Sequence, residues 1–137
     1  MRSTFKDSVA SVALFYEESV LLGKRLVKYK GQLIPLGGYW SIFGGLVEEG
    51  ESLTEAATRE LKEETEIIID PSDLIFVKQL ETPSVYYNIY ACHLNSLVLP
   101  NLNFEHTEYG WFKTSDLSSF PYLIDEPLVS ALKEYIS

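Results

Sequence analysis

The chain has 137 residues, 46% of them hydrophobic and 23% charged, with a formal net charge of −9 and a pI near 4.6. This length and composition predict a single globular domain, residues 1–137, with a sizeable core. The acidic balance argues against nucleic acid as a partner, and no apolar run has transmembrane length. With one cysteine and no signal-peptide pattern at the start, we expect a cytoplasmic protein without an internal disulfide.

Two strands, residues 8–16 and 20–27, are predicted to form a hairpin near the start of the chain. Gly23 inside the second strand predicts a bulge or a close approach of another segment. Lys24 and Arg25 follow it and are candidate contacts for a substrate phosphate, because arginine offers a bidentate fork. Exposed charges at the edge of a sheet are the alternative.

Residues 28–38 contain glycine and proline at intervals and predict a loop. Residues 39–43 then predict a short strand that leads into Gly44 and Gly45. Paired glycines let a backbone carbonyl turn toward a bound ion without obstruction from a side chain. A plain tight turn before a helix is the alternative.

Residues 45–67 carry eight glutamates against two basic side chains. Ser52 and Glu55 form a capping-box pattern, so we expect a helix to begin at Ser52. At 100° per residue, Glu60 and Glu64 continue the apolar stripe that the first half of this helix directs to the core. Carboxylates turned toward a core are tolerated when they are paired or bound to metal. A solvated acidic helix is the alternative.

The second half of the chain predicts three strands and a helix. The strands are residues 74–80, 84–94 and 108–113, with a loop over 96–106, and the helix is residues 125–136. Tyr86 lies on a face of the second of these strands where it could stack a nucleobase. A half-buried face of the sheet is the alternative.

The spacing of residues around the acidic helix resembles the signature of Nudix hydrolases. The matching positions are Gly45, Glu51, Arg59, Glu60, Leu61, Glu63, Glu64 and Ile67. Two positions depart from the pattern, because Glu66 stands where the family has glycine and Phe43 where it usually has proline. Glycine ends a helix in the left-handed conformation at little cost. We therefore expect a shifted helix end at Glu66, with the site retained.

This resemblance implies an α+β fold in which a mixed β-sheet lies between helices, an α/β/α sandwich. It also implies hydrolysis of a phosphoanhydride (pyrophosphate) bond in a nucleoside diphosphate linked to another moiety, a small-molecule nucleotide. Carboxylates are hard ligands that suit Mg²⁺ or Mn²⁺. A divalent cation lets a negatively charged substrate bind at an acidic site, because the ion bridges carboxylate and phosphate oxygens.

The resemblance also implies roles for particular residues. The implied metal ligands are the Gly44 carbonyl, Glu60, Glu63 and Glu64. One of these glutamates or a neighbour such as Glu105, with Glu108 in reserve, would act as general base. Arg59 would orient Glu63 or Glu51 through a charge-assisted bond. The candidate substrate contacts are Lys24, Arg25, Tyr39 and Tyr86.

A non-catalytic Nudix module that binds or senses a nucleotide is the competing interpretation. Such a module is expected to lose the inner glutamates, whereas this chain keeps Glu60, Glu63 and Glu64. The sequence does not select among nucleotide sugars, ADP-ribose, dinucleoside polyphosphates and nucleoside triphosphates. It also leaves the oligomeric state open, a homodimer included.

Overall fold

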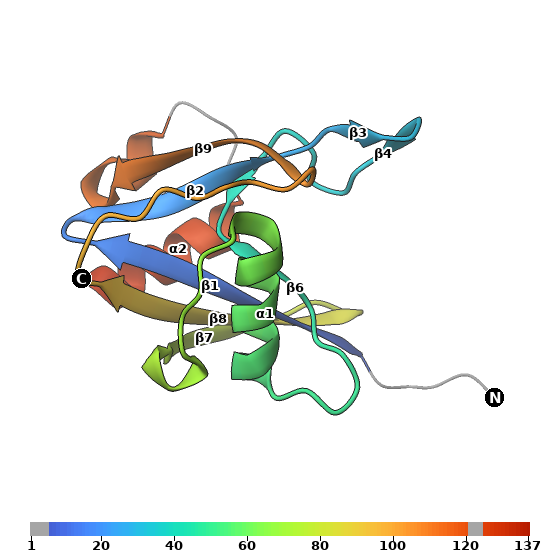
Figure 1. Cartoon of the computed structure of the whole chain (residues 1–137), viewed down its shortest axis with the longest axis horizontal. Coiled ribbons are helices and arrows are strands. Elements are labelled where there is room, and N and C mark those ends of the chain that lie inside the picture. Colours follow the sequence, from blue (N-terminus) through green and yellow to red (C-terminus); the bar gives the residue numbers. More distant parts are fainter. Residues whose placement is uncertain (1–5, 121–124) are drawn as a thin grey trace.

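The computed structural model describes residues 6–120 and 125–137. A mixed β-sheet lies between two helices, as expected, with α1 on one face and α2 on the other (Figure 1). The helices are α1 (Leu53–Thr65) and α2 (Glu126–Ile136), and two short 3₁₀ helices cover Pro71–Asp73 and Thr114–Ser119. The strands are β1 (Asp7–Tyr16), β2 (Ser19–Arg25), β3 (Lys28–Tyr29), β4 (Gln32–Leu33), β5 (Trp40–Ser41), β6 (Phe43–Leu46), β7 (Ile75–Glu81), β8 (Val85–Leu94) and β9 (His106–Lys113).

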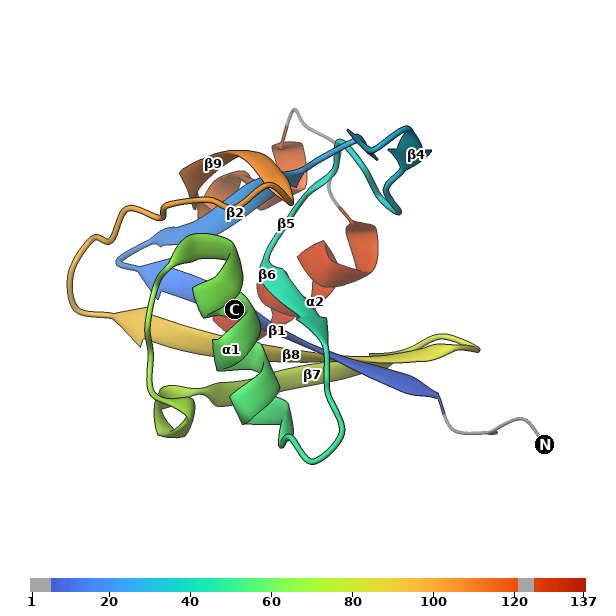
Figure 2. The same cartoon turned by 45° about the vertical axis from the view of Figure 1, so that its right-hand side comes forward.

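The centre of the sheet is the parallel pair of β1 and β8, which are in register from Asp7 opposite Val85 to Tyr16 opposite Leu94. All other strand pairs are antiparallel, in the order β5-β2-β1-β8-β7, with β6 also on β1 and β9 also on β2. Because side chains alternate along a strand, β1 contributes to two cores. Ala13 and Phe15 pack with α2, whereas Val12 and Leu14 pack with α1. Figure 2 shows the two helices on opposite sides of β1.

Strand β1 changes its antiparallel partner along its length. Val9–Val12 pair with β6, and only the last two residues of β1 pair with β2. Phe43 at the start of β6 is buried against Gly23 of β2, where an added Cβ would lie 2.6 Å from its ring. The same ring packs on His106, with 4.7 Å between ring centroids. The residue that replaces the usual proline therefore joins β2, β6 and β9.

Several element boundaries differ from those that the sequence predicted. The strand expected over 20–27 ends at Arg25, next to a register shift between Lys24 and Arg25. The loop expected over 28–38 contains the β3–β4 hairpin, and the strand expected over 39–43 is divided between β5 and β6. Backbone pairing with distant strands decides the bounds of β2, β5 and β6, and local sequence does not record it, whereas β3 and β4 pair only with each other. No helix among the described residues is long and apolar enough to cross a membrane.

Candidate functional site

Helix α1 is fixed at its start by the capping box that the sequence predicted. Ser52 Oγ accepts a bond from the Glu55 amide at 3.2 Å, and the Glu55 carboxylate accepts one from the Ser52 amide at 2.9 Å. Ala56 and Ala57 are fully buried against the sheet. Their small side chains let the helix approach β6 closely, which carries the following glutamates onto the Gly44–Gly45 segment.

Glu64 is fully buried, and neither carboxylate oxygen has a hydrogen-bond partner among the described residues. Burial, together with the nearby charges of Glu105 and Glu60, raises the pKa of this carboxyl to about 9. The Gly44 amide opposes this shift, although it forms no hydrogen bond of normal geometry with the carboxylate. A buried acid without a partner is costly, so this position favours a bound ligand, because no group among the described residues pairs with the carboxylate oxygens.

Glu60 lies against the backbone of Gly45. A Cβ added at Gly45 would lie 2.4 Å from the Glu60 carboxyl carbon, so the carboxylate occupies space that any larger residue would fill. The Glu60 side chain is 15% exposed, and burial raises its pKa. Gly45 thus makes room for Glu60 beside Glu64.

Arg59 joins three parts of the acidic segment. Its Nε and one terminal nitrogen donate to the two oxygens of Glu51 at 2.6 and 3.0 Å, a bidentate pair. The other terminal nitrogen donates to both oxygens of Glu63 at 3.1 Å, and Arg59 also donates to the Leu46 carbonyl at 3.0 Å. These bonds raise the pKa of Arg59 and lower that of Glu51. Glu63 is half-exposed and held toward solvent at the edge of the helix face.

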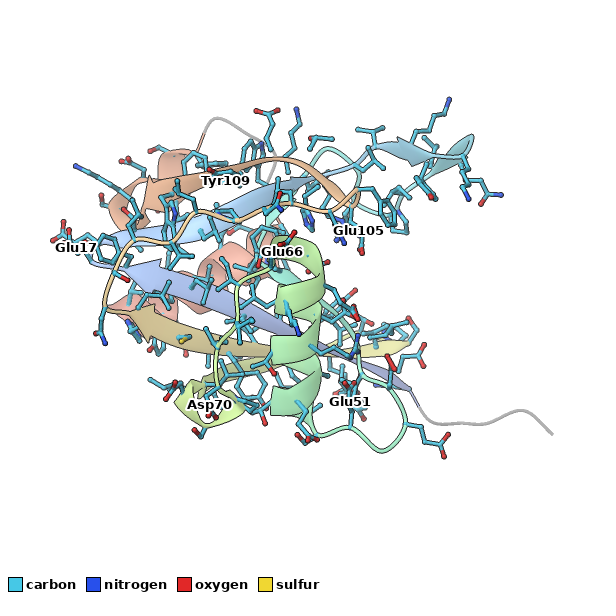
Figure 3. All side chains as sticks on the ribbon, in the orientation of Figure 1. Glu17, Glu51, Glu66, Asp70, Glu105 and Tyr109 are labelled. Carbon is cyan, nitrogen blue, oxygen red and sulfur yellow. The ribbon has the colours of Figure 1, made fainter. Side chains whose placement is uncertain are left out.

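Glu105 precedes β9 and is held by Asn103. The Asn103 side chain accepts a bond from the Glu105 amide at 2.9 Å and donates to its carboxylate at 3.3 Å. The Asn103 amide donates to the Glu64 carbonyl at 3.1 Å. Figure 3 shows Glu105 between the end of α1 near Glu66 and the β3–β4 hairpin. Nothing in the sequence singled out Asn103, because its role depends on a contact between distant segments.

Glu66 takes the left-handed conformation itself, with φ 62° and ψ 13°, and α1 ends at Thr65. The expected shift of the helix end was therefore wrong. The Asn101 side chain donates to the Glu66 carboxylate at 2.6 Å, and the Asn101 amide donates to the Thr65 carbonyl at 2.8 Å. These bonds stabilise a conformation that usually requires glycine.

A cavity of about 440 Å³ opens beside the Gly44 backbone. Arg25 and Leu36 lie in its wall, together with Tyr87 of β8 and Asp125 at the start of α2. This volume is within the range of small-molecule sites. Arg25 donates through Nε to the Pro35 carbonyl at 3.2 Å, which leaves its terminal nitrogens without a partner among the described residues.

Three of the four candidate substrate contacts lie away from this cavity. Lys24 forms an ion pair with Glu108 at 3.6 Å. Glu108, the reserve candidate for the general base, is therefore paired with Lys24. Tyr39 and Tyr86 do not line the cavity, and the Lys6 ammonium lies 4.7 Å from the Tyr86 ring centroid. Tyr87 points to the cavity because it shares its face with Val9 opposite it in β1. The sequence carried no signal for which face of β8 would line a cavity.

His106 is a further buried group that sequence reasoning did not place near the site. Its pKa is lowered to about 4, first by burial and then by Arg25, so the ring is neutral at physiological pH. Neither ring nitrogen has a hydrogen-bond partner in the described part of the chain. Its contact with Phe43 makes it part of the packing that positions β6.

The glutamates fit a divalent ion that keeps water and substrate among its ligands. Within residues 6–120 and 125–137, no three acidic, histidine or cysteine side chains are gathered into a complete metal site. Mg²⁺ is usually bound by one or two carboxylates, with the remaining ligands from water and phosphate. The unpartnered Glu64 oxygens, with Glu60 beside them, provide that donor set.

A family model and solved structures agree on one fold. A family model described as the NUDIX domain matches residues 5–132. The MutT protein from Methanosarcina mazei Go1 aligns with a TM-score of 0.78 and 22% identity, over 99% of this chain and 96% of that one. The NUDIX domain of Shewanella oneidensis NrtR, complexed with ADP ribose, aligns with a TM-score of 0.74 and 18% identity, over 97% of this chain and 90% of that one.

One curated relative is similar over part of its length. An octanoyltransferase from Myxococcus xanthus is 33% identical over an alignment of 81 residues that covers 55% of this chain. The match spans 23% of that protein, so the likeness concerns a minor part of it.

Proposed function

Since the chain belongs to the Nudix family, we propose that it hydrolyses a phosphoanhydride bond in a nucleoside diphosphate linked to another group, with Mg²⁺ or Mn²⁺ as cofactor. Nudix hydrolases generally cleave pyrophosphate bonds and use such ions. This chain contributes the acidic face of α1 and the cavity beside Gly44, and Arg25 lies between them.

The buried Glu64 carboxyl is the observation that carries the proposal. Its oxygens lack partners among the described residues, and its pKa is raised to about 9. A purely structural position would be filled at lower cost by an apolar residue, because an unpartnered buried acid destabilises the fold. Strongly shifted pKa values beside a cavity are typical of functional sites.

Each residue has a distinct role in the proposed reaction. Glu60, Glu63 and Glu64, with the Gly44 carbonyl, would hold the ion, which neutralises phosphate charge and activates water when bound. Arg59 fixes Glu63 through the bond at 3.1 Å. Glu105 would accept the proton of the attacking water.

The substrate is proposed to lie with its nucleoside in the cavity of about 440 Å³. Tyr87 offers an aromatic wall there, and Asp125 offers an acceptor for amino groups of a base. Arg25 is placed to bind the phosphates, because its terminal nitrogens have no partner within the described residues.

A substrate screen that detects the phosphorylated products of hydrolysis tests the proposal directly. Purified protein is incubated with Mg²⁺ or Mn²⁺ and with ADP-ribose, nucleotide sugars, dinucleoside polyphosphates, FAD and nucleoside triphosphates in turn. We expect turnover of at least one of these compounds, lost on addition of EDTA. Glu64→Gln should retain the fold and lower kcat by orders of magnitude, while Glu49→Gln, at an exposed position of the same segment, should not.

Two results would contradict the proposal. Full activity in Glu64→Gln would show that the buried carboxyl is not needed for turnover. Tight binding of a nucleotide without turnover at either ion would favour the competing sensor module.

A further inference from the structure

We propose that Tyr29, Phe104 and the small cavity beside them form a second subsite for a planar ring, so that the preferred substrate carries an aromatic group at each end of its phosphate chain. This inference rests on the proposed function and specifies its substrate class. The first ring would occupy the cavity of about 440 Å³ and the second the Tyr29–Phe104 subsite.

The two cavities share one residue. Arg25 lines the larger cavity together with Gly44, and it also lines the smaller cavity together with Glu105 and Phe104. A phosphate chain that passes Arg25 would therefore have one end directed into each cavity. Glu105 is held by Asn103, whose backbone amide donates to the Glu64 carbonyl at 3.1 Å, so this path passes the glutamates proposed to hold the ion.

The size of the smaller cavity suits one ring system. Its volume is about 160 Å³, roughly half the lower limit for sites that take a whole drug-sized ligand. Leu26 and Ile34 provide apolar walls, and Phe104 provides an aromatic one. These residues would bury a ring but would exclude a complete nucleotide.

The aromatic pair of Tyr29 and Phe104 belongs to neither of the two hydrophobic core clusters. The rings of Tyr29 and Phe104 lie 4.6 Å apart between centroids, yet Phe104 is 58% exposed and Tyr29 is 39% exposed. Tyr29 belongs to the two-stranded β3–β4 hairpin, whose strand residues are all exposed. Such a hairpin is marginal without further packing, so the exposed aromatic pair, with Tyr29 next to the turn, is a candidate surface for binding.

Charge at the hairpin favours a phosphorylated ring over an apolar partner. The Lys30 ammonium lies 5.3 Å from the Tyr29 ring centroid. It is a cation in a chain with a net charge of −9. Cations beside stacked aromatics are typical of surfaces that bind bases and their phosphates.

The test compares two substrate classes in matched variants. KM and kcat are measured for a dinucleoside polyphosphate, which has two rings, and for the nucleoside triphosphate of the same base, which has one. Phe104→Ala should raise KM for the first compound about 5- to 150-fold, the range expected for loss of one stacked base, and change KM for the triphosphate by less than about twofold. Phe104→Leu, which keeps apolar volume without a flat ring, should give the same split.

Leu33→Ala is the matched control, because Leu33 is 75% exposed on the same hairpin and lines neither cavity. It should leave both KM values unchanged. Equal effects of Phe104→Ala on the two compounds, or none on the two-ringed one, would overturn the inference.

Binding separates failure of this inference from failure of the proposed function. A dinucleoside polyphosphate with methylene bridges in place of the anhydride oxygens is titrated by calorimetry in Mg²⁺. If no natural compound is cleaved, the hydrolase proposal fails. The subsite then stands if Phe104→Ala weakens binding of the analogue, and falls if binding is absent or unchanged.

Discussion

The stability of the metal-free protein should fall as pH rises, because of Glu64. Its pKa is about 9 in the folded state and near 4.5 in the unfolded chain. Between these values the folded state holds a proton that the unfolded state has released. Each pH unit in this window therefore lowers the free energy of unfolding by roughly 1.4 kcal/mol. The loss begins above the unfolded pKa, is complete near pH 9, and amounts to roughly 3 kcal/mol between pH 6 and pH 8.

Urea unfolding in EDTA at pH 6, 7 and 8 measures this loss. With a slope of roughly 1–3 kcal/mol per molar urea, the midpoint should fall by about 1–3 M across the series. Glu64→Gln cannot ionise, so most of the decline should disappear and the variant should be more stable than the wild type at pH 8. Glu49→Gln, which changes an exposed glutamate, should retain the full decline.

Addition of Mg²⁺ should oppose the decline, since the ion binds the carboxylate and displaces the proton. Its stabilising effect should increase from pH 6 to pH 8 in the wild type and be lost in Glu64→Gln. A metal-free wild type with equal stability at both pH values would refute the assignment of the raised pKa to Glu64. So would an undiminished decline in Glu64→Gln.

Two further predictions concern the neighbours of this carboxyl. Gly45→Ala should lower kcat at least about tenfold with little change in Tm, because the new methyl displaces the flexible Glu60 carboxylate. Gly44→Ala should instead lower Tm, because its methyl would lie 2.5 Å from the Ala10 carbonyl oxygen in the sheet, and equal Tm values would contradict this contrast. Asn103→Asp keeps the acceptor for the Glu105 amide but repels the Glu105 carboxylate, so we expect a lower kcat at unchanged Tm. An unchanged kcat would show that Asn103 stabilises the loop but does not position Glu105 for the reaction.

The acidic helix was predictable because its signals are local. The capping box fixes its start at Ser52, and the 3.6-residue period places Glu60 and Glu64 on the buried face. The mixed sheet between helices followed from the resemblance that the motif carries, and the structure confirms it. Spacing along the chain was sufficient here, because the residues concerned belong to one helix and the turn before it.

The substrate side of the site was less accessible from the sequence. Tyr86 and Tyr87 are adjacent, and only the register of β8 on β1 decides that Tyr87 faces the cavity. Lys24 and Arg25 looked equivalent, but the register shift between them sends one to Glu108 and the other to the cavity. Contacts that depend on the pairing of distant strands cannot be recognised from a single sequence.

The glutamate at position 66 shows how a departure from a motif is accommodated by another segment. A non-glycine residue in the left-handed conformation costs roughly 1 kcal/mol. The last carbonyls of α1 also need donors, as at any helix end. Asn101 addresses both needs, since its amide bonds the Thr65 carbonyl and its side chain bonds the Glu66 carboxylate. Because Asn103 in the same loop bonds the Glu64 carbonyl and holds Glu105, the segment that stabilises the unusual helix end also carries the proposed base to the buried carboxyl.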